Sequence, residues 1–388
     1  MDLETIRKDT VGCTDKIFLN SAGSSLMPRN VVKVMNDYLT EEERMGGYGL
    51  ARKKAEDVEA FYPEVAKLIN AQPHNIAFAF HATDAYAKAL SSIPFSPGDY
   101  ILTTNDDYIS NQIAFLSLQK RFGINILRAS NLPNGDLDLD NFEDLVKKHH
   151  PILVAVTHVP TSSGLIQQAE EIGKICRAHN TWYLLDACQS VGQLVVDVEK
   201  IGCDFLSVTG RKFLRGPRGT GFLYVSDRVI EEKLEPLFLD MRGADWVGID
   251  DYQIRMNAKR FETWELSYAS LLGLTEAVRY ANSIGMREIQ DYNQKLSQKL
   301  REDLSQIPGL QVLDRGSKLA SIITFTKPGI PLESTEKVLR DNHIIYSVTT
   351  KENALIDFTQ KGVEWAIRLS PHYFNTFEEI QQVKEVLW

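Results

Sequence analysis

Short apolar runs separated by turn residues and helical patterns recur through the middle of the chain. The runs lie at 76–80, 100–104, 124–128, 152–157, 182–185, 205–208 and 222–225. Runs of this length that are apolar throughout are typical of strands buried on both faces. Patterns with helical spacing are found at 29–44, 51–70, 110–122, 138–149 and 168–178. This alternation predicts an α/β domain with a mostly parallel sheet and helices on both faces.

The pattern changes near residue 268. A long helix pair is predicted over about 268–306, and shorter elements follow it. Strands are predicted near 320–326, 343–349 and 365–369, with helices near 333–340 and 377–387. We therefore predict an N-terminal segment (1–28) that lines a cleft and packs on the small domain, a large domain (29–267) and a smaller α+β domain (268–388).

Composition and charge narrow the possible functions. The chain has 388 residues, of which 43% are hydrophobic and 24% charged, and its formal net charge is −9. It has no basic run that would favour nucleic-acid binding, and no apolar run approaches the roughly 20 residues of a membrane span. The polar start disfavours a signal peptide. The four cysteines lack CxxC spacing, so we expect no metal site and a cytoplasmic protein.

Candidate catalytic residues lie at the ends of the predicted strands. Asp186 follows one buried run, and Lys212 follows the next run within 209–212 (TGRK). Ligands of open α/β sheets bind outside such strand ends. A pyridoxal 5'-phosphate (PLP) enzyme needs a lysine for the Schiff base and a carboxylate at the pyridine nitrogen. Lys212 could alternatively belong to a basic surface turn, because arginines surround it.

Other segments supply the remaining requirements of a PLP site. The segment 81–85 (HATDA) opens a helix whose free N–H groups could bind a phosphate, with Thr83 and Asp84 as expected caps. Tyr108 could stack on a flat cofactor, and Arg368 could bind a carboxylate. Each could instead be structural: a capped helix, a packed loop tyrosine or a salt-bridged arginine. The combination is more specific than any single member.

The chain resembles the class V aminotransferase group of PLP enzymes, which includes cysteine desulfurases, isopenicillin N epimerase-like proteins and the C–S lyase of ergothioneine biosynthesis. The resemblance runs nearly from end to end, and its most specific segments are 186–189 (DACQ), 209–212 (TGRK) and 216–221 (GPRGTG). It implies the PLP-dependent aspartate aminotransferase-like fold (fold type I) and PLP as cofactor. It also implies a homodimer that acts on a small amino-acid substrate.

The resemblance also implies roles for individual residues. Lys212 would be catalytic and would form the Schiff base. Cofactor binding would fall to Ala82, Thr83, Tyr108, Thr161, Asp186, Gln189, Thr209 and Lys212. Substrate binding would fall to Asn20, Ser21, Ala22 and Arg368.

The chain departs from the desulfurase pattern at three places, and its segments 46–48 and 210–219, with Tyr108, look more like the lyase and epimerase branch. Arg211 replaces a histidine, and Trp264-Glu265 replaces a Gly-Thr pair whose threonine reaches a neighbouring subunit's phosphate. The segment 346–362 contains no cysteine. We therefore expect a C–S lyase that eliminates sulfur from an S-substituted cysteine or its sulfoxide, and not a Cys-dependent desulfurase.

Alternatives to the lyase remain open. An aminotransferase or an amino-acid epimerase would use the same residues. A binding protein without catalysis is disfavoured because both Lys212 and Asp186 are present. A nicotinamide dehydrogenase is disfavoured because 216–221 does not match G-x-G-x-x-G.

Overall fold

A seven-stranded sheet forms the centre of the computed structural model, which describes all 388 residues. The strands lie in the order β2-β8-β7-β6-β5-β3-β4. Their bounds are β2 Ile76–Ala79, β3 Tyr100–Thr104, β4 Asn125–Ala129, β5 Leu153–Thr157, β6 Trp182–Asp186, β7 Phe205–Thr209 and β8 Gly221–Val225. Only β8 is antiparallel to its neighbours, β2 and β7. The predicted α/β architecture with a mostly parallel sheet is confirmed.

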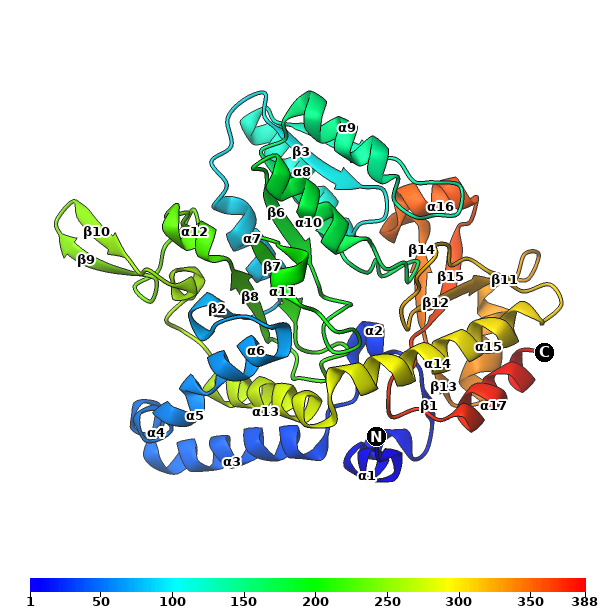
Figure 1. Cartoon of the computed structure of the whole chain (residues 1–388). Coiled ribbons are helices and arrows are strands. Elements are labelled where there is room, and N and C mark those ends of the chain that lie inside the picture. Colours follow the sequence, from blue (N-terminus) through cyan, green and yellow to red (C-terminus); the bar gives the residue numbers. More distant parts are fainter.

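Helices cover both faces of this sheet (Figure 1). In the large domain they are α3 Arg29–Met45, α4 Gly47–Lys53, α5 Ala55–Glu59, α6 Phe61–Ile69, α7 Ala82–Ser91, α8 Ile109–Phe122, α9 Leu139–His149, α10 Ala169–Ala178, α11 Val198–Ile201 and α12 Asp227–Glu231. Successive β6 side chains enter different cores: Tyr183 and Leu185 join the cluster that includes α6, α9 and α10. Leu184 joins the cluster that includes α7 and α8. The strand is apolar throughout because both faces are buried.

The helix predicted over 51–70 is divided into α4, α5 and α6. Pro63 lies in the first turn of α6. Proline has no N–H to donate to the carbonyl of Glu59, and its ring would clash with that carbonyl in a continuous helix. The prediction of one helix was wrong because it followed the apolar spacing and gave this proline no weight.

The C-terminal part forms a four-stranded antiparallel sheet in the order β11-β12-β15-β14. Its strands are β11 Gln311–Val312, β12 Ile323–Thr326, β14 Ser347–Thr350 and β15 Trp365–Leu369. The helices are α13 Tyr268–Ile284, α14 Met286–Ser305, α15 Leu332–Asp341, α16 Leu355–Lys361 and α17 Phe377–Leu387. Helix α13 packs on α3 and α6, whereas α14 packs on α17. The proposed division at residue 267 stays a prediction.

The N-terminal segment joins the two parts of the chain. It comprises α1 Leu3–Asp9, β1 Ile17–Phe18 and α2 Ser21–Ser24. Strand β1 pairs in parallel with β13 (Ile344–Ile345), and Asn20 bridges to Ser370. These pairings bring the segment that follows β1 close to the end of β15.

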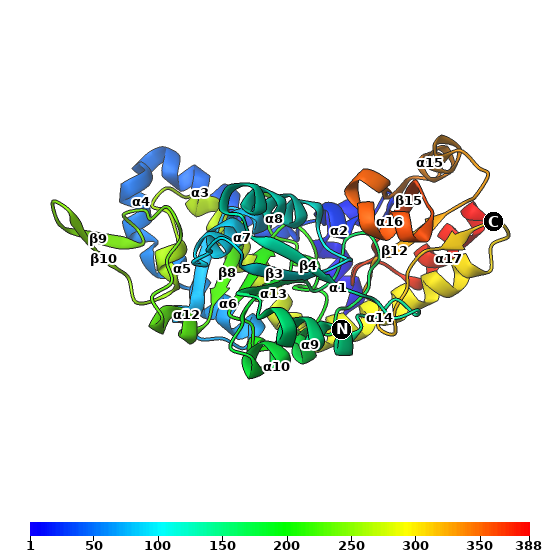
Figure 2. The ribbon, with the colours of Figure 1, turned by 90° about the horizontal axis from the view of Figure 1, so that it is seen from above.

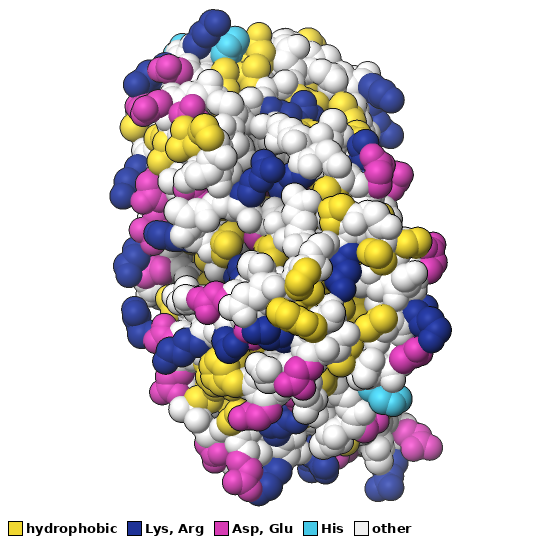
Figure 3. Space-filling model, turned by 90° about the vertical axis from the view of Figure 1, so that its right-hand side faces the viewer, with side chains coloured by type: hydrophobic (Ala, Val, Ile, Leu, Met, Phe, Trp, Pro, Cys, Tyr) yellow, Lys and Arg dark blue, Asp and Glu magenta, His cyan; other side chains and the backbone are white.

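A two-stranded hairpin, β9 (Ala244–Gly248) and β10 (Asp251–Ile254), projects from the large domain in both ribbon views (Figures 1 and 2). Its side chains include Trp246 and Ile249, which are 81% and 89% exposed. On the face seen in Figure 3, positive and negative side chains are interspersed. None of the helices has the length and apolar character needed to cross a membrane.

Candidate active site

A cavity of about 340 Å³ lies beyond the carboxyl ends of β5, β6 and β7. Its size is within the range of small-molecule and cofactor sites. It is lined by His81, Ala82, Thr83, Tyr108, Thr157, Val159, Thr161, Asp186, Cys188, Gln189, Thr209, Arg211, Lys212, Arg218 and Gly219. All eight residues predicted to bind the cofactor are among them, although they come from five separate segments of the chain.

The strand register places the ends of β2 and β7 beside the start of β8, at one end of the cavity. Gly221 at the start of β8 pairs with Thr209 at the end of β7 and with Ala79 at the end of β2. A Cβ on Gly221 would lie 2.2 Å from the Val208 carbonyl oxygen and 3.3 Å from the His81 Cα. Only glycine permits this close approach. The N-terminus of α7 therefore lies beside the end of β7.

Helix α7 begins differently from the prediction. Its N-cap is His81, whose Nδ1 accepts a hydrogen bond from the Asp84 N–H at 3.0 Å. The expected caps, Thr83 and Asp84, lie inside the first turn. Histidine is not among the favoured cap residues, so its role as the cap could not be predicted from residue type. The first backbone bond of the helix is donated by Ala85 to His81, which leaves the N–H groups of Ala82 and Thr83 for a ligand.

Asp186 is held by a hydrogen-bond network that we call the carboxylate wall: Asp107, Asn111, Thr157 and Asp186. The Asp186 carboxylate accepts hydrogen bonds from the Cys188 N–H at 3.0 Å and from Asn111 Nδ2 at 3.2 Å. Asn111 Nδ2 also lies 3.0 Å from Asp107 Oδ1. These contacts fix the orientation of the Asp186 carboxylate toward the cavity.

Asp107 and Asn111 were not predicted as site residues. Asp107 accepts hydrogen bonds from the Thr157 hydroxyl, Asn111 and the Tyr108 N–H. Burial raises the pKa of Asp107, and these hydrogen bonds oppose that rise. Their positions in the sequence could have indicated a role in the site. Asp107 follows a strand end, and Asn111 lies four residues later, on the first turn of α8.

Lys212 is buried, with 8% of its surface exposed, and its Nζ forms no hydrogen bond or ion pair. Nζ lies 5.9 Å from the centre of the Tyr108 ring. Burial lowers the pKa of Lys212, while Cys188 and Asp186 act in the opposite direction. A lowered pKa increases the fraction of neutral amine, which is the nucleophilic form.

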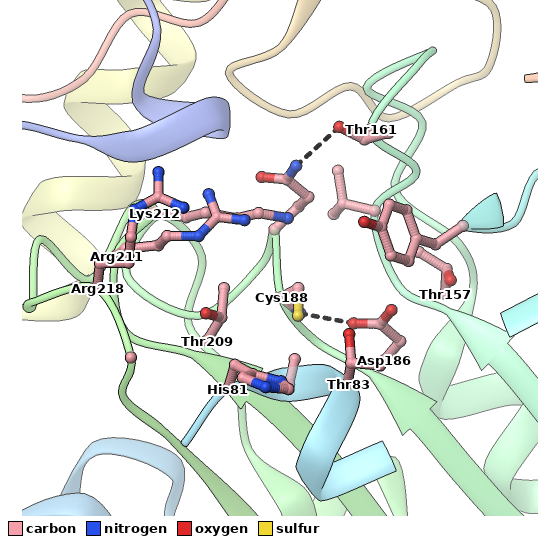
Figure 4. Close-up of a pocket in the computed structure, with 15 residues that line it drawn as sticks. His81, Thr83, Thr157, Thr161, Asp186, Cys188, Thr209, Arg211, Lys212 and Arg218 are labelled. Carbon is pink, nitrogen blue, oxygen red and sulfur yellow. Dashed lines mark hydrogen bonds between the residues drawn. The ribbon is translucent and has the colours of Figure 1, made fainter. Parts of the chain in front are cut away.

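Arg211 and Arg218 accompany Lys212, and we call these three residues the cation wall. They lie at one side of the cavity, while Thr157 and Asp186 lie at the other (Figure 4). Neither arginine has a carboxylate oxygen within ion-pair distance, although Arg211 donates a hydrogen bond to the Gly23 carbonyl. Burial, followed by the charge of Arg218, lowers the pKa of Arg211. The cation wall is therefore positive and uncompensated.

The predicted substrate residues adjoin the cavity without lining it. Arg368 on β15 is buried and donates hydrogen bonds to the Thr161 hydroxyl and to Asn20 Oδ1. Burial, followed by the charge of Arg211, lowers the pKa of Arg368 to about 10. The Ala22 carbonyl accepts a hydrogen bond from Gln189 Nε2 at 3.1 Å.

Ser21 is the exception among these four residues. Its hydroxyl accepts a hydrogen bond from the Ser25 hydroxyl at 3.1 Å, and its side chain is fully buried. The structure therefore connects Asn20, Ala22 and Arg368 to the cavity through Thr161 and Gln189, but gives Ser21 no such connection.

The residues present fit PLP. Gln189 Oε1 and Arg368 Nε are buried without hydrogen-bond partners, and buried polar atoms of this kind call for a ligand or water. Lys212 supplies an amine, Asp186 a fixed carboxylate, and the start of α7 two free N–H groups. An aldehyde, a pyridine nitrogen and a phosphate would each have a matching group.

Comparisons with known proteins agree with this fit. The family described as aminotransferase class V matches residues 17–383. A probable cysteine desulfurase of Methanothermobacter thermautotrophicus is 31% identical over 100% of this chain and 98% of its own length. One of Pyrococcus abyssi is 29% identical over 99% and 96%. An apo cysteine desulfurase structure from Thermococcus onnurineus has a TM-score of 0.91 and 27% identity, and covers 99% of this chain and 96% of that one.

Fold and site together define a PLP-dependent enzyme of fold type I. The chain belongs to the class V aminotransferase family, and PLP is its cofactor.

The comparisons overturn the expected reaction. The chain was expected to be a C–S lyase for S-substituted cysteines and not a Cys-dependent desulfurase, but its end-to-end relatives are described as probable cysteine desulfurases. The expectation rested on the similarity to the lyase and epimerase branch and on the cysteine-free segment 346–362. A segment without cysteine does not exclude desulfuration, because the acceptor thiol can be supplied by a separate molecule.

Proposed function

We propose that this enzyme removes sulfur from cysteine. One cysteine and one acceptor thiol would yield one alanine and one persulfide, so the sulfur moves to the thiol and the C–S bond is replaced by a C–H bond. The observation that carries the proposal is the full-length similarity to probable cysteine desulfurases. The cavity supports it, because a lysine, a carboxylate and an arginine surround it at separate positions.

Lys212 and Asp186 would perform the central chemistry. Bound PLP supplies an electron-withdrawing ring that stabilises negative charge at the substrate Cα. Lys212 carries a lowered pKa, so its neutral amine can take the Cα proton as a general base and later return a proton. Asp186, held by Asn111, would keep the pyridine nitrogen protonated. Tyr108 would cover the ring and exclude water.

Arg368 would bind the substrate carboxylate. Its guanidinium is buried, has an unpartnered Nε and lies against Thr161, which contacts the cavity. A buried guanidinium without a carboxylate partner has a strong electrostatic reason to bind an anion. Asn20 would orient the guanidinium, and Gln189 would link the α2 segment to the same region.

The products of a cysteine reaction test the proposal. Holoenzyme incubated with L-cysteine and dithiothreitol should release alanine and sulfide in equal amounts, because the dithiol converts the persulfide to sulfide. Alanine is quantified by mass spectrometry and sulfide by a colorimetric assay. Release of pyruvate and ammonia in place of alanine would contradict the proposal, as would a requirement for a keto acid.

We further propose a cytoplasmic homodimer. Phe238, Trp246 and Ile249 are 86%, 81% and 89% exposed, and exposed apolar groups on and beside one hairpin suit a protein contact. All four cysteines are free, as in a reducing compartment. Light scattering should give twice the 43.9 kDa chain mass. A monomer mass that persists as the protein concentration rises would contradict the dimer.

A further inference from the structure

The cavity has two ends that attract anions, and they lie along the sheet edge in a definite order. Thr209 on β7, Gly221 on β8 and the start of α7 form one end. Thr161, which follows β5, forms the other end with Arg368 and Asn20. Asp186 on β6 lies between them, because β6 separates β7 from β5 in the sheet. Substrate carboxylate and cofactor phosphate thus have separate ends available.

Two arginines whose charge the protein does not neutralise line the cavity. Arg218 precedes β8, beside the start of α7. Arg211 donates a hydrogen bond to the Gly23 carbonyl, and burial together with the Arg211 charge lowers the pKa of Arg368. Arg218 lies three residues before Gly221, and it lines the cavity with His81, Thr83 and Arg211. Neither Arg211 nor Arg218 takes part in any of the 25 ion pairs of the chain. Like charges that lie close together without a counter-ion disfavour the empty site, and a bound anion removes that cost.

Other hydrogen-bond donors that could bind an anion lie in the same cavity. The N–H groups of Ala82 and Thr83 precede the first hydrogen bond of α7, a helix of 10 residues. The hydroxyls of Thr83 and Thr209 line the cavity and form no hydrogen bond within the protein. Lys212, more than nine-tenths buried and also unpartnered, opens into the same cavity. Donors of this kind, together with two guanidinium groups, suit a dianionic phosphate.

We propose that Arg211 and Arg218 bind the phosphate of PLP, so that a single chain supplies the positive charge of the phosphate site. Arg218 approaches from the turn before β8, and Arg211 from the turn after β7. The two arginines act in addition to the N–H and hydroxyl groups of Ala82, Thr83 and Thr209.

Cofactor analogues separate this role from others. Apo-enzyme is titrated with PLP and with pyridoxal, which lacks the phosphate, and binding is followed by cofactor absorbance. Arg218→Ala and Arg211→Ala should each weaken PLP binding by about tenfold or more, the scale of a lost charge-assisted hydrogen bond. Pyridoxal binding should change less than about twofold, because the lost interaction is with the phosphate. Arg218→Lys should retain part of the PLP affinity.

Arg44→Ala is the matched control, since Arg44 is exposed on α3 and also lacks an ion pair. It should leave both affinities unchanged. Two outcomes would overturn the proposal. One is an equal loss of PLP and pyridoxal affinity in the arginine variants, which would indicate a structural role. The other is unchanged PLP affinity with a raised KM for substrate, which would assign the arginines to the substrate.

Discussion

The carboxylate wall and the cation wall face the same cavity, but their charges are partnered in different ways. Asp107 and Asp186 accept hydrogen bonds from Asn111 and from backbone N–H groups within their own wall. Lys212, by contrast, has no partner, and Arg211 has only a carbonyl. The carboxylate wall is therefore ordered by its own hydrogen bonds, whereas the cation wall needs a bound ligand to pair its charges. This difference indicates that the ligand is negatively charged and that it meets a fixed carboxylate.

Loss of the amine in the cation wall should have the largest effect. Lys212→Ala should lower kcat by about 10⁴-fold, near the upper limit for a general base. The apo form of the variant should unfold close to the apo wild type, because Lys212 Nζ has no hydrogen bond or ion pair to lose. Kinetics on the holoenzyme and calorimetry on the apo-enzyme measure the two effects. Activity within tenfold of wild type would exclude Lys212 as the base.

Within the carboxylate wall, substitution of Asp186 should lower kcat more than substitution of Asp107. Asp186→Asn should lower kcat by about 10²- to 10³-fold, because it removes a charge aimed into the cavity. Asp107→Asn should cost about tenfold or less, since Asp107 acts through Asn111. The KM values should change little in either variant. Equal losses in the two variants would contradict the distinction between a contacting and a positioning carboxylate.

Arg368 should affect substrate binding more than turnover. Arg368→Lys keeps the charge but loses the forked donor geometry. A hydrogen bond to a charged group contributes about 1.5–3 kcal/mol, so KM should rise roughly 10- to 150-fold. Arg44→Lys is the control and should leave KM unchanged. A fall in kcat with constant KM would place Arg368 in the chemical step instead.

The smallest effect concerns a carboxyl group at the contact between the two parts of the chain. Burial and the charge of Asp357 raise the pKa of Asp106 to about 6 from its ordinary value of 3.8. Because the folded pKa is higher, the protonated form stabilises the fold below pH 4, and this stability is lost as the pH rises through 6. Asp106→Asn should thus unfold at a higher temperature than wild type at pH 8, by about 1–2 °C per kcal/mol recovered.

At pH 4 the Asp106→Asn variant and wild type should unfold at similar temperatures. Differential scanning calorimetry at the two pH values measures the change. An equal difference in unfolding temperature between variant and wild type at pH 4 and pH 8 would mean that Asp106 does not titrate in this range.

The parts of the site that lie at strand ends could be predicted from the sequence. Asp186 and Lys212 follow apolar runs, and neighbouring parallel strands end at the same edge of a sheet. The contact between Arg368 and Thr161 could not be predicted from pattern alone, because it depends on how β15 packs against the large domain. The burial of Ser21 could not be predicted either, because it depends on how the N-terminal segment packs against the rest of the chain.

Other parts of the structure had weak local signals. Pro63 marks the break between α5 and α6, yet the apolar spacing runs across it. The β9–β10 hairpin has large apolar side chains that are exposed, so burial patterns gave no guide to it. The reaction was the least predictable feature, because the same lysine, aspartate and arginine serve several reactions of a carbanion at Cα.

The most direct test of the account is the covalent position of the cofactor. Holoenzyme is reduced with borohydride, digested and examined by mass spectrometry. The account predicts a phosphopyridoxyl group on Lys212, the amine that the cation wall leaves without a partner. It also predicts that no other lysine is modified in wild type. A modification on a different lysine, or a bound cofactor that borohydride does not fix to the chain, would contradict it.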